Sequence, residues 1–163
     1  MNVQISKNAE LFFKALEDIW VAEQSWFGSP NNAVWSCTQA VEKTMKGFLR
    51  CLNREFDYGH ELKELLFALD TLIDLSVNTV DYINYFNRFS VGLRYKNMAN
   101  DPSPEDARIA ISRAKHILQE FSGNPKMSQF MDEAREVHAK ILRLCYEKYS
   151  DVDISSDKPE EYY

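Results

Sequence analysis

The sequence has few of the residues that form tight turns, with only 5 glycines and 5 prolines among 163 residues. That supply is too small for a chain of many hairpins, and no segment alternates apolar and polar residues over the length of a strand. No apolar run approaches the roughly 20 residues that cross a bilayer. The first residues place acidic Glu10 beside a very short apolar stretch, so we expect no signal peptide. These absences argue against a β fold and against a membrane protein.

Cysteine is also scarce, since the chain has 3 cysteines that are widely spaced and form no CxxC pair. Such spacing predicts neither a disulfide framework nor a zinc site. We expect Cys37, Cys51 and Cys145 to be small, buried, reduced side chains of a cytoplasmic protein. Glycine-rich phosphate loops are absent, and so are Glu-x-x-His pairs of the kind that bind metals in helical bundles. We therefore expect no metal and no cofactor.

The balance of charge is acidic, with a net charge of -6 and an isoelectric point near 5.1. A field of that sign repels nucleic acid, so any binding to phosphate must use a local basic patch.

Hydrophobic residues make up 45% of the chain and aromatic residues 13%, which suffices for the core of one domain. The apolar residues recur with a helical period and predict an all-α fold of six helices. The expected helices cover about 8–26 and 31–52, begin near residues 60, 78 and 104, and end with a helix over about 125–149. Ser103 is the predicted N-cap of the fifth helix, and Asn124-Pro125 repeats that cap-then-proline pattern for the sixth. Residues 150–163 are acidic and poor in apolar side chains, which predicts a disordered tail after a single domain of residues 1–149.

The second expected helix carries a row of basic residues at spacings of three and four. Lys43, Lys46 and Arg50 follow Gln39 on a face roughly opposite the apolar stripe. In an acidic protein this row predicts a local positive ridge that could bind phosphate oxygens. The alternative is an ordinary solvated face of an amphipathic helix, and charge alone favours that alternative.

His60 lies where the third expected helix begins. A helix N-terminus attracts anions through its unpaired N–H groups, so His60 could donate to a phosphate there. A capping or packing role for this histidine is an equal alternative.

Several segments, taken in order, resemble the HEPN family (higher eukaryotes and prokaryotes nucleotide-binding domain). The stretch TQAVEKTMKGFL of residues 38–49 is similar to that family's second-helix pattern, and GHEL of residues 59–62 to the start of its third helix. The segment NYFNRFSVGLRY of residues 84–95 resembles the family's segment that ends in Arg-Tyr-Pro, with Lys96 in place of the proline. The start of the fifth helix and its AKHIL of residues 114–118 fit the family's last core helix. The resemblance covers about residues 11–121 and leaves out the sixth helix.

The resemblance implies an up-down bundle of four to five core helices, to which this chain adds a C-terminal helix. It also implies a homodimer, a nucleotide or RNA as ligand, and a minimal nucleotidyltransferase as partner in a toxin–antitoxin-like pair. By this carry-over the ligand site would combine the basic ridge with residues beyond it, in the set Lys43, Lys46, Arg50, His60, Arg94 and Tyr95. Arg94 would bind phosphate in a bidentate manner, and Tyr95 would stack on a base or pack in the core.

Some members of that family are metal-independent ribonucleases that carry arginine, four to six residues, then histidine on a late helix. Arg54 and His60 have this spacing, but they lie at the loop before the third helix. Arg113 and His116 are too close in sequence, and Arg135 and His138 lie outside the resemblance. We therefore favour a binding module over an enzyme, with Arg54 and His60 as the weak catalytic candidates.

The sixth helix carries a stripe of Met127, Met131, Ile141 and Cys145 outside the shared core. An apolar stripe needs a cover, and a second copy of the chain is the simplest one. A dimeric interaction protein with no ligand of its own is the remaining alternative.

Overall fold

The computed structural model describes residues 3–54, 56, 61–92 and 101–149, and within them it contains six α-helices and no strand. The helices are α1 (Glu10–Ser25), α2 (Pro30–Cys51), α3 (Leu62–Asp70), α4 (Val77–Gly92), α5 (Pro104–Ser122) and α6 (Ser128–Tyr149). The prediction of an all-α bundle is confirmed. None of the described helices is both long enough and apolar enough to span a membrane.

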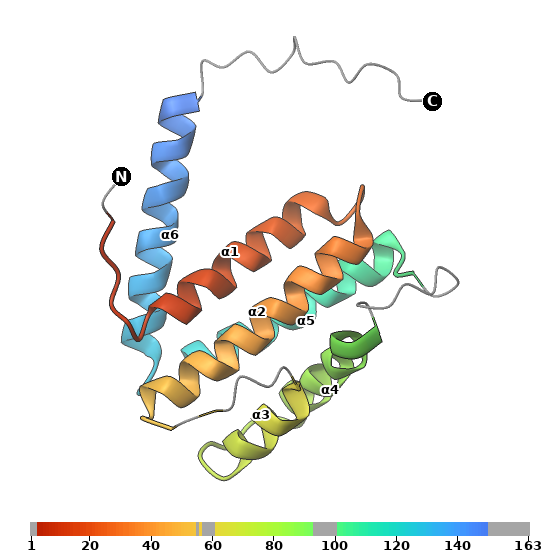
Figure 1. The fold of residues 1–163 in the computed structure, drawn as a ribbon, viewed down its shortest axis with the longest axis vertical. Helices are drawn as coiled ribbons and strands as arrows, with labels where there is room; N and C mark the ends of the chain where they lie inside the picture. The colour runs from red at the N-terminus through yellow and green to blue at the C-terminus, as the bar shows by residue number, and fades with distance from the viewer. Residues whose placement is uncertain (1–2, 55, 57–60, 93–100, 150–163) are drawn as a thin grey trace.

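Helix α2 is the centre of the bundle. It packs against α1, α3, α4 and α5, and most of its residues are buried. Figure 1 shows α1 and α2 side by side, α5 along the other side of α2, and the α3–α4 pair at one flank. A helix enclosed on several sides buries polar positions together with apolar ones, and Lys46 and Glu42 are buried in this way.

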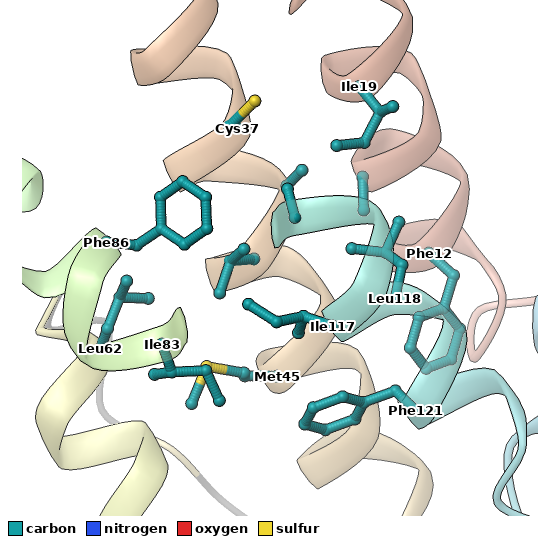
Figure 2. Packing of buried hydrophobic residues seen from close by; sticks show 14 of the residues in the cluster. Phe12, Ile19, Cys37, Met45, Leu62, Ile83, Phe86, Ile117, Leu118 and Phe121 are labelled. Carbon is teal, nitrogen blue, oxygen red and sulfur yellow. The ribbon is translucent and has the colours of Figure 1, made fainter. Parts of the chain in front are cut away.

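The core consists of aromatic, long aliphatic and alanine side chains, and each of the six described helices contributes to it. Figure 2 shows Phe12 of α1, Met45 of α2, Ile83 of α4 and Phe121 of α5 directed into this shared interior. Phe121 also meets Phe48 edge-on, with ring centroids 5.3 Å apart. Edge-to-face aromatic pairs of this kind stabilise a core beyond the area that they bury.

The start of α5 is as predicted, whereas the start of α6 is not. The Ser103 hydroxyl accepts a hydrogen bond from the backbone N–H of Asp106, and the Asp106 carboxylate accepts from the backbone N–H of Ser103. This reciprocal capping box stabilises the first turn of α5. Asn124-Pro125 instead forms a turn, in which the Asn124 side-chain oxygen accepts from the N–H of Lys126, and α6 begins at Ser128.

Helix α6 packs against α1 and, more lightly, against α5. Met131 and Ala134 are fully buried, and so is Met127 just before the helix. The prediction that the Met127 and Met131 side chains need an outside cover is therefore wrong, because α1 and the core of the same chain cover them. Figure 1 shows that the second half of α6 runs out beyond the bundle.

Candidate functional site

Each described cation of the predicted basic ridge has a carboxylate partner. The Lys43 ammonium lies 2.5 Å from the Asp18 carboxylate, and the Lys46 ammonium lies 2.6 Å from that of Glu42. Arg50 lies 3.7 Å from the Glu10 carboxylate and donates a hydrogen bond to the Lys7 carbonyl. Two of the three carboxylates come from α1, which packs along this side of α2.

These pairings correct the expectation of an open basic ridge on α2. The Lys46 side chain is only 10% exposed, so an incoming phosphate cannot surround its ammonium group. The Lys43 and Arg50 side chains are 28% and 30% exposed, and both pair with carboxylates of α1. Lys43 and Arg50 therefore stabilise the packing of α1 on α2, whereas Lys46 pairs within α2 itself.

The other predicted site residues divide into two groups. His60, Arg94 and Tyr95 lie outside the described residues, so their roles stay predictions. Arg54 is exposed in the loop after α2, which leaves the ribonuclease candidate Arg54–His60 untested.

The late pair Arg135 and His138 does not form a site. Arg135 bonds to Asp132 and to the Ser122 hydroxyl, whereas the His138 ring packs edge-on against Phe13. Burial lowers the pKa of His138, with Glu17 opposing that effect, so the ring is neutral at pH 7. Each residue of this pair therefore has a structural partner of its own.

Arginine, histidine and tyrosine side chains gather on the opposite flank, where α4 packs against α5. The Arg113 guanidinium lies 4.2 Å from the centroid of the Tyr85 ring and 5.2 Å from that of Tyr82. The His116 ring meets Tyr82 edge-on at 5.2 Å, and Arg88 lies over Tyr85 at 5.4 Å. We call this surface the tyrosine–arginine face and define it by Tyr82, Tyr85, Arg88, Arg113 and His116.

The arginines of the tyrosine–arginine face differ from the cations of α2 because they have no carboxylate partner among the described residues. Within the described residues, no carboxylate lies within ion-pair distance of Arg88 or Arg113. Their contacts are with tyrosine rings, which leave the N–H groups at the edge of each guanidinium available to a ligand. Arg88 is exposed and Arg113 is half-buried, so the charge of Arg88 lies at the surface and that of Arg113 lies deeper.

Tyr85 keeps its proton at neutral pH. Burial raises the pKa of its phenol, and the positive charge of Arg113 opposes that effect without cancelling it. A half-buried neutral tyrosine offers both a ring face for stacking and a hydroxyl that donates a hydrogen bond.

Glu120 ties the start of α4 to α5 beside the tyrosine–arginine face. Its carboxylate accepts hydrogen bonds from the Ser76 backbone N–H at 2.7 Å, the Ser76 hydroxyl at 2.6 Å and the Thr79 hydroxyl at 2.5 Å. It also lies 3.9 Å from the His116 Nε2 atom. These bonds cap the N-terminus of α4 and hold Tyr82 of α4 in place against α5.

The Glu120 cap predicts a specific loss of stability in acid. Burial raises the pKa of this carboxyl, but the bonds from Ser76 and Thr79 outweigh burial, so its pKa falls below 4.5. A folded-state pKa below the unfolded value means that the contribution is present above that unfolded value and is lost as pH falls through the folded one. Glu120→Gln is expected to cost about 1–3 kcal/mol of unfolding free energy at neutral pH.

Urea unfolding between about pH 7 and about pH 3 tests this expectation, and the wild-type and Glu120→Gln stabilities should converge as the pH falls. A difference between the two proteins that stays constant over this range would contradict it.

The cysteines match their prediction only in part. Cys37 is buried and Cys51 is half-buried, but Cys145 is exposed on the second half of α6. Over the ranges that the structure describes, no three side chains of histidine, cysteine, aspartate or glutamate cluster as metal ligands would.

Comparisons with known proteins agree with this helical arrangement. The family model described as HEPN domain matches residues 8–124, which is well over half of the chain. The chain belongs to the HEPN family. A solved structure described as that of an archaeal HEPN homologue superposes with a TM-score of 0.61 at 21% identity. That match covers 73% of this chain and 98% of the archaeal chain, and it supports the HEPN fold alone. A search of curated proteins finds no match.

The HEPN family match ends at residue 124, before α6 begins at Ser128. Helix α6 thus lies outside the residues that match the HEPN family model. The tyrosine–arginine face lies within the HEPN domain, since α4 and α5 both do.

Sequence reasoning missed the tyrosine–arginine face, although part of its signal was present. Tyr82 and Tyr85 are three residues apart on α4, and Arg113 and His116 are three apart on α5. Each pair therefore shares one helix face. Spacing within a helix cannot reveal that two faces from separate helices meet, so only the packing of α4 on α5 shows the cluster.

Proposed function

We propose that this HEPN chain is a binding module for RNA or a nucleotide and that phosphate binds on its tyrosine–arginine face. The observation that carries the proposal is the position of Arg113 between two tyrosine rings, with no carboxylate within ion-pair distance in the described residues. Elsewhere in the described bundle, cations such as Lys43 and Lys46 are neutralised by neighbouring carboxylates. Unneutralised arginines in a chain of net charge -6 supply the local patch that phosphate binding needs.

The chemistry of the face suits single-stranded RNA or a mononucleotide. A guanidinium pairs with two phosphate oxygens at once, and a tyrosine ring offers a stacking surface to an unpaired base. Arg88 is exposed and can meet a phosphate first, while half-buried Arg113 and Tyr85 can hold the ligand close to the protein. Asp106 is a carboxylate whose charge acts on Tyr85, and it accepts hydrogen bonds in the capping box of α5.

The binding test is a fluorescence-anisotropy titration of a labelled single-stranded RNA at several salt concentrations. Arg88→Glu changes an exposed side chain, so the fold is retained while the charge of the face is reversed. We expect the affinity to fall about tenfold. We also expect the slope of log affinity against log salt concentration to decrease by about one, which corresponds to one lost phosphate contact. Lys126→Glu, an equal charge change in the exposed turn before α6, is the matched control and should bind like the wild type.

Two outcomes would contradict the binding proposal. One is wild-type protein that binds neither the RNA nor ATP or GTP at low salt. The other is an equal loss of affinity in Arg88→Glu and Lys126→Glu, which would indicate a diffuse charge effect instead of a site.

A ribonuclease activity is the second candidate, and one observation favours it. Arg113 and His116, three positions apart on α5, both contact the Tyr82 ring, so an arginine and a histidine lie on one side of the helix. An arginine can bind the scissile phosphate while a histidine moves a proton of the 2′-hydroxyl. Incubation with RNA in EDTA decides between binding and cleavage. His116→Ala and His60→Ala then distinguish this pair from Arg54–His60.

The assembly of the protein is also part of the proposal. HEPN domains often dimerise, and we propose that this chain does so. A minimal nucleotidyltransferase partner and a cytoplasmic location remain predictions from the family resemblance and from cysteine usage. Co-expression with the nucleotidyltransferase of a neighbouring coding region, followed by co-purification, tests the partner.

A further inference from the structure

A groove lies where the end of α1 meets α5. Its volume is about 450 Å³, which falls within the range of about 300–1,000 Å³ that small-ligand sites occupy. Figure 1 shows the end of α1 and the beginning of α5 at the same end of the bundle. Among the described residues, the groove is lined by an indole, an aliphatic side chain, a hydroxyl and three charged groups, which belong to Trp26, Ile111, Ser112, Glu23, Arg108 and Lys115. We call it the Trp26 groove.

The apolar wall of the Trp26 groove is fixed by the bundle. Trp26 and Ile111 are half-buried and pack against the hydrophobic core. The Arg108 guanidinium lies over the Trp26 indole, 5.7 Å from the ring centroid, and the Arg108 side chain stays 63% exposed. Proteins that recognise single-stranded RNA stack its unpaired bases on aromatic rings and on guanidinium planes. The groove therefore offers a planar ligand a surface that is already formed before binding.

The charges around the Trp26 groove are balanced, which argues against a bare phosphate as its ligand. Lys115 forms an ion pair with Glu23, and the Arg108 guanidinium lies 3.7 Å from the Glu105 carboxylate. The Lys115 and Glu23 side chains are 56% and 36% exposed, so their pair still presents donors and acceptors to the groove. A planar, uncharged ligand with a hydrogen-bonding edge fits both the apolar wall and this polar pair. A nucleobase has these three properties.

The surface of α5 connects the Trp26 groove with the tyrosine–arginine face. Arg108, Ser112 and His116 follow one another at spacings of four residues, so they form one row along the helix, and all three are exposed. Arg108 lines the groove and His116 contacts Tyr82, so the row begins at the groove and ends at the face. Residues 107–119 contain no aspartate or glutamate. A nucleic-acid strand that follows this row therefore meets no carboxylate of α5 between the two sites.

We propose that the Trp26 groove is a nucleobase subsite and that a single RNA strand crosses α5 from this groove to the tyrosine–arginine face. One base of the strand stacks against Arg108 and Trp26, while a phosphate further along the strand pairs with Arg113 or Arg88. This inference rests on the proposed RNA binding and specifies the ligand as an oligonucleotide. The groove and the face lie on different flanks of α5, which is about 10 Å wide with its side chains, so a mononucleotide occupies only one of them.

Two leucine substitutions on α5 test the subsite. Ser112→Leu fills the groove from an exposed position, and leucine is a good helix former, so the bundle stays folded. We expect the affinity for labelled hexaadenylate, measured by fluorescence anisotropy, to fall about tenfold, which is the effect of one lost stacked base. The affinity for AMP, measured by calorimetry, should not change. Gln119→Leu is the matched control at an exposed position that does not line the groove, and it should bind both ligands like the wild type.

Tryptophan fluorescence locates the stacked base independently of these variants. A base that stacks beside the Trp26 indole quenches its emission, so hexaadenylate should reduce the fluorescence of the wild-type protein in a saturable manner. Trp26→Phe keeps an aromatic ring at this position, so it should bind hexaadenylate with nearly the wild-type affinity but lose most of the quenching. Trp20→Phe removes an indole of α1 that does not line the groove, and it should retain the quenching.

Several results would overturn this inference. Ser112→Leu could bind hexaadenylate as the wild type does, or lose no more affinity than Gln119→Leu. A loss of AMP affinity in Ser112→Leu would make the groove a mononucleotide site, and unchanged quenching in Trp26→Phe would place the base elsewhere.

The outcomes separate this inference from the proposed function. If Arg88→Glu weakens RNA binding while Ser112→Leu does not, the tyrosine–arginine face binds RNA without the groove, and only the subsite is refuted. If the wild-type protein binds no RNA and no nucleotide, the proposed function fails, and the subsite fails with it.

Discussion

Glu42→Ala is expected to lower the free energy of unfolding by about 3–5 kcal/mol. The Lys46 and Glu42 side chains are 10% and 7% exposed, and their charged atoms lie 2.6 Å apart inside the bundle. Removal of the carboxylate would leave the Lys46 ammonium buried, with water largely excluded and, within the described residues, no other carboxylate at ion-pair distance. An uncompensated buried charge costs much more than the intact pair contributes.

Urea unfolding of the variant measures this cost, and an exposed pair in the same chain serves as the control. Glu10 and Lys14 have the same four-residue spacing and lie 2.9 Å apart, but their side chains are 42% and 48% exposed. Lys14→Ala should therefore cost well under about 1 kcal/mol. If the two variants were equally destabilised, burial would not be the reason for the importance of Glu42.

The double variant Glu42→Met/Lys46→Met adds a second check. Replacement of both partners by apolar side chains of similar length removes the buried charge altogether, so it should cost less than Glu42→Ala alone. Lys46→Glu would place a second carboxylate beside buried Glu42, so this variant is expected to unfold partly and to lose RNA binding for that reason. A binding experiment on α2 therefore needs a stability measurement beside it.

Gly47→Ala is expected to destabilise the protein by about 2 kcal/mol, although alanine usually stabilises a helix. A Cβ atom at position 47 would lie 2.8 Å from the Cε1 atom of Phe12. Phe12 is fully buried, so its ring cannot move aside without disturbing the contact between α1 and α2. The steric cost thus exceeds the gain in helix propensity of roughly 1 kcal/mol.

Gly28→Ala is the matched control, because a Cβ atom there would meet nothing within 4 Å and Gly28 has no positive φ. It should be neutral or slightly stabilising. A smaller side chain at position 12, as in Phe12→Leu/Gly47→Ala, should recover part of the stability that Gly47→Ala loses. A Gly47→Ala protein as stable as the wild type would show that α1 and α2 are not held so close.

The helices could be predicted because their signals are local. Apolar periodicity gave the bounds of α1 and α2 to within about two residues, and Ser103-Pro104 gave the start of α5. Asn124-Pro125 has the same local signal, yet it forms a turn before α6. A cap motif indicates that a helix can start at a residue, whereas the following residues and their packing determine where the helix begins.

The state of the basic residues could not be predicted, because two of their partners come from α1 and the third pair is buried within α2. Asp18 and Glu10 on α1 neutralise Lys43 and Arg50 on α2. The spacing of residues along α2 does not predict these carboxylate partners, because they belong to another helix. Glu42 was visible beside the row, but only the enclosure of α2 by its neighbours shows that the Glu42–Lys46 pair is buried. The interpretation of the row as a solvated face is also wrong for Lys46.

The dimer prediction started from a stripe that mixes two surfaces. Met127 and Met131 belong to the core of the chain, whereas Ile141 and Cys145 do not pack there. The sequence presents these residues as one continuous stripe, since the helix period does not change along α6. The divergence of α6 from α1 divides the stripe, and only its second half is available to a partner.

An NMR titration of the isotopically labelled protein with a short single-stranded RNA tests the central claim most directly. We predict that the side-chain signals of Tyr82, Arg113 and His116 shift together in a saturable manner, while those of Lys43 and Lys46 stay unchanged. Shifts confined to the α2 cations, or no shifts at RNA concentrations far above those of the protein, would contradict a phosphate site on the tyrosine–arginine face.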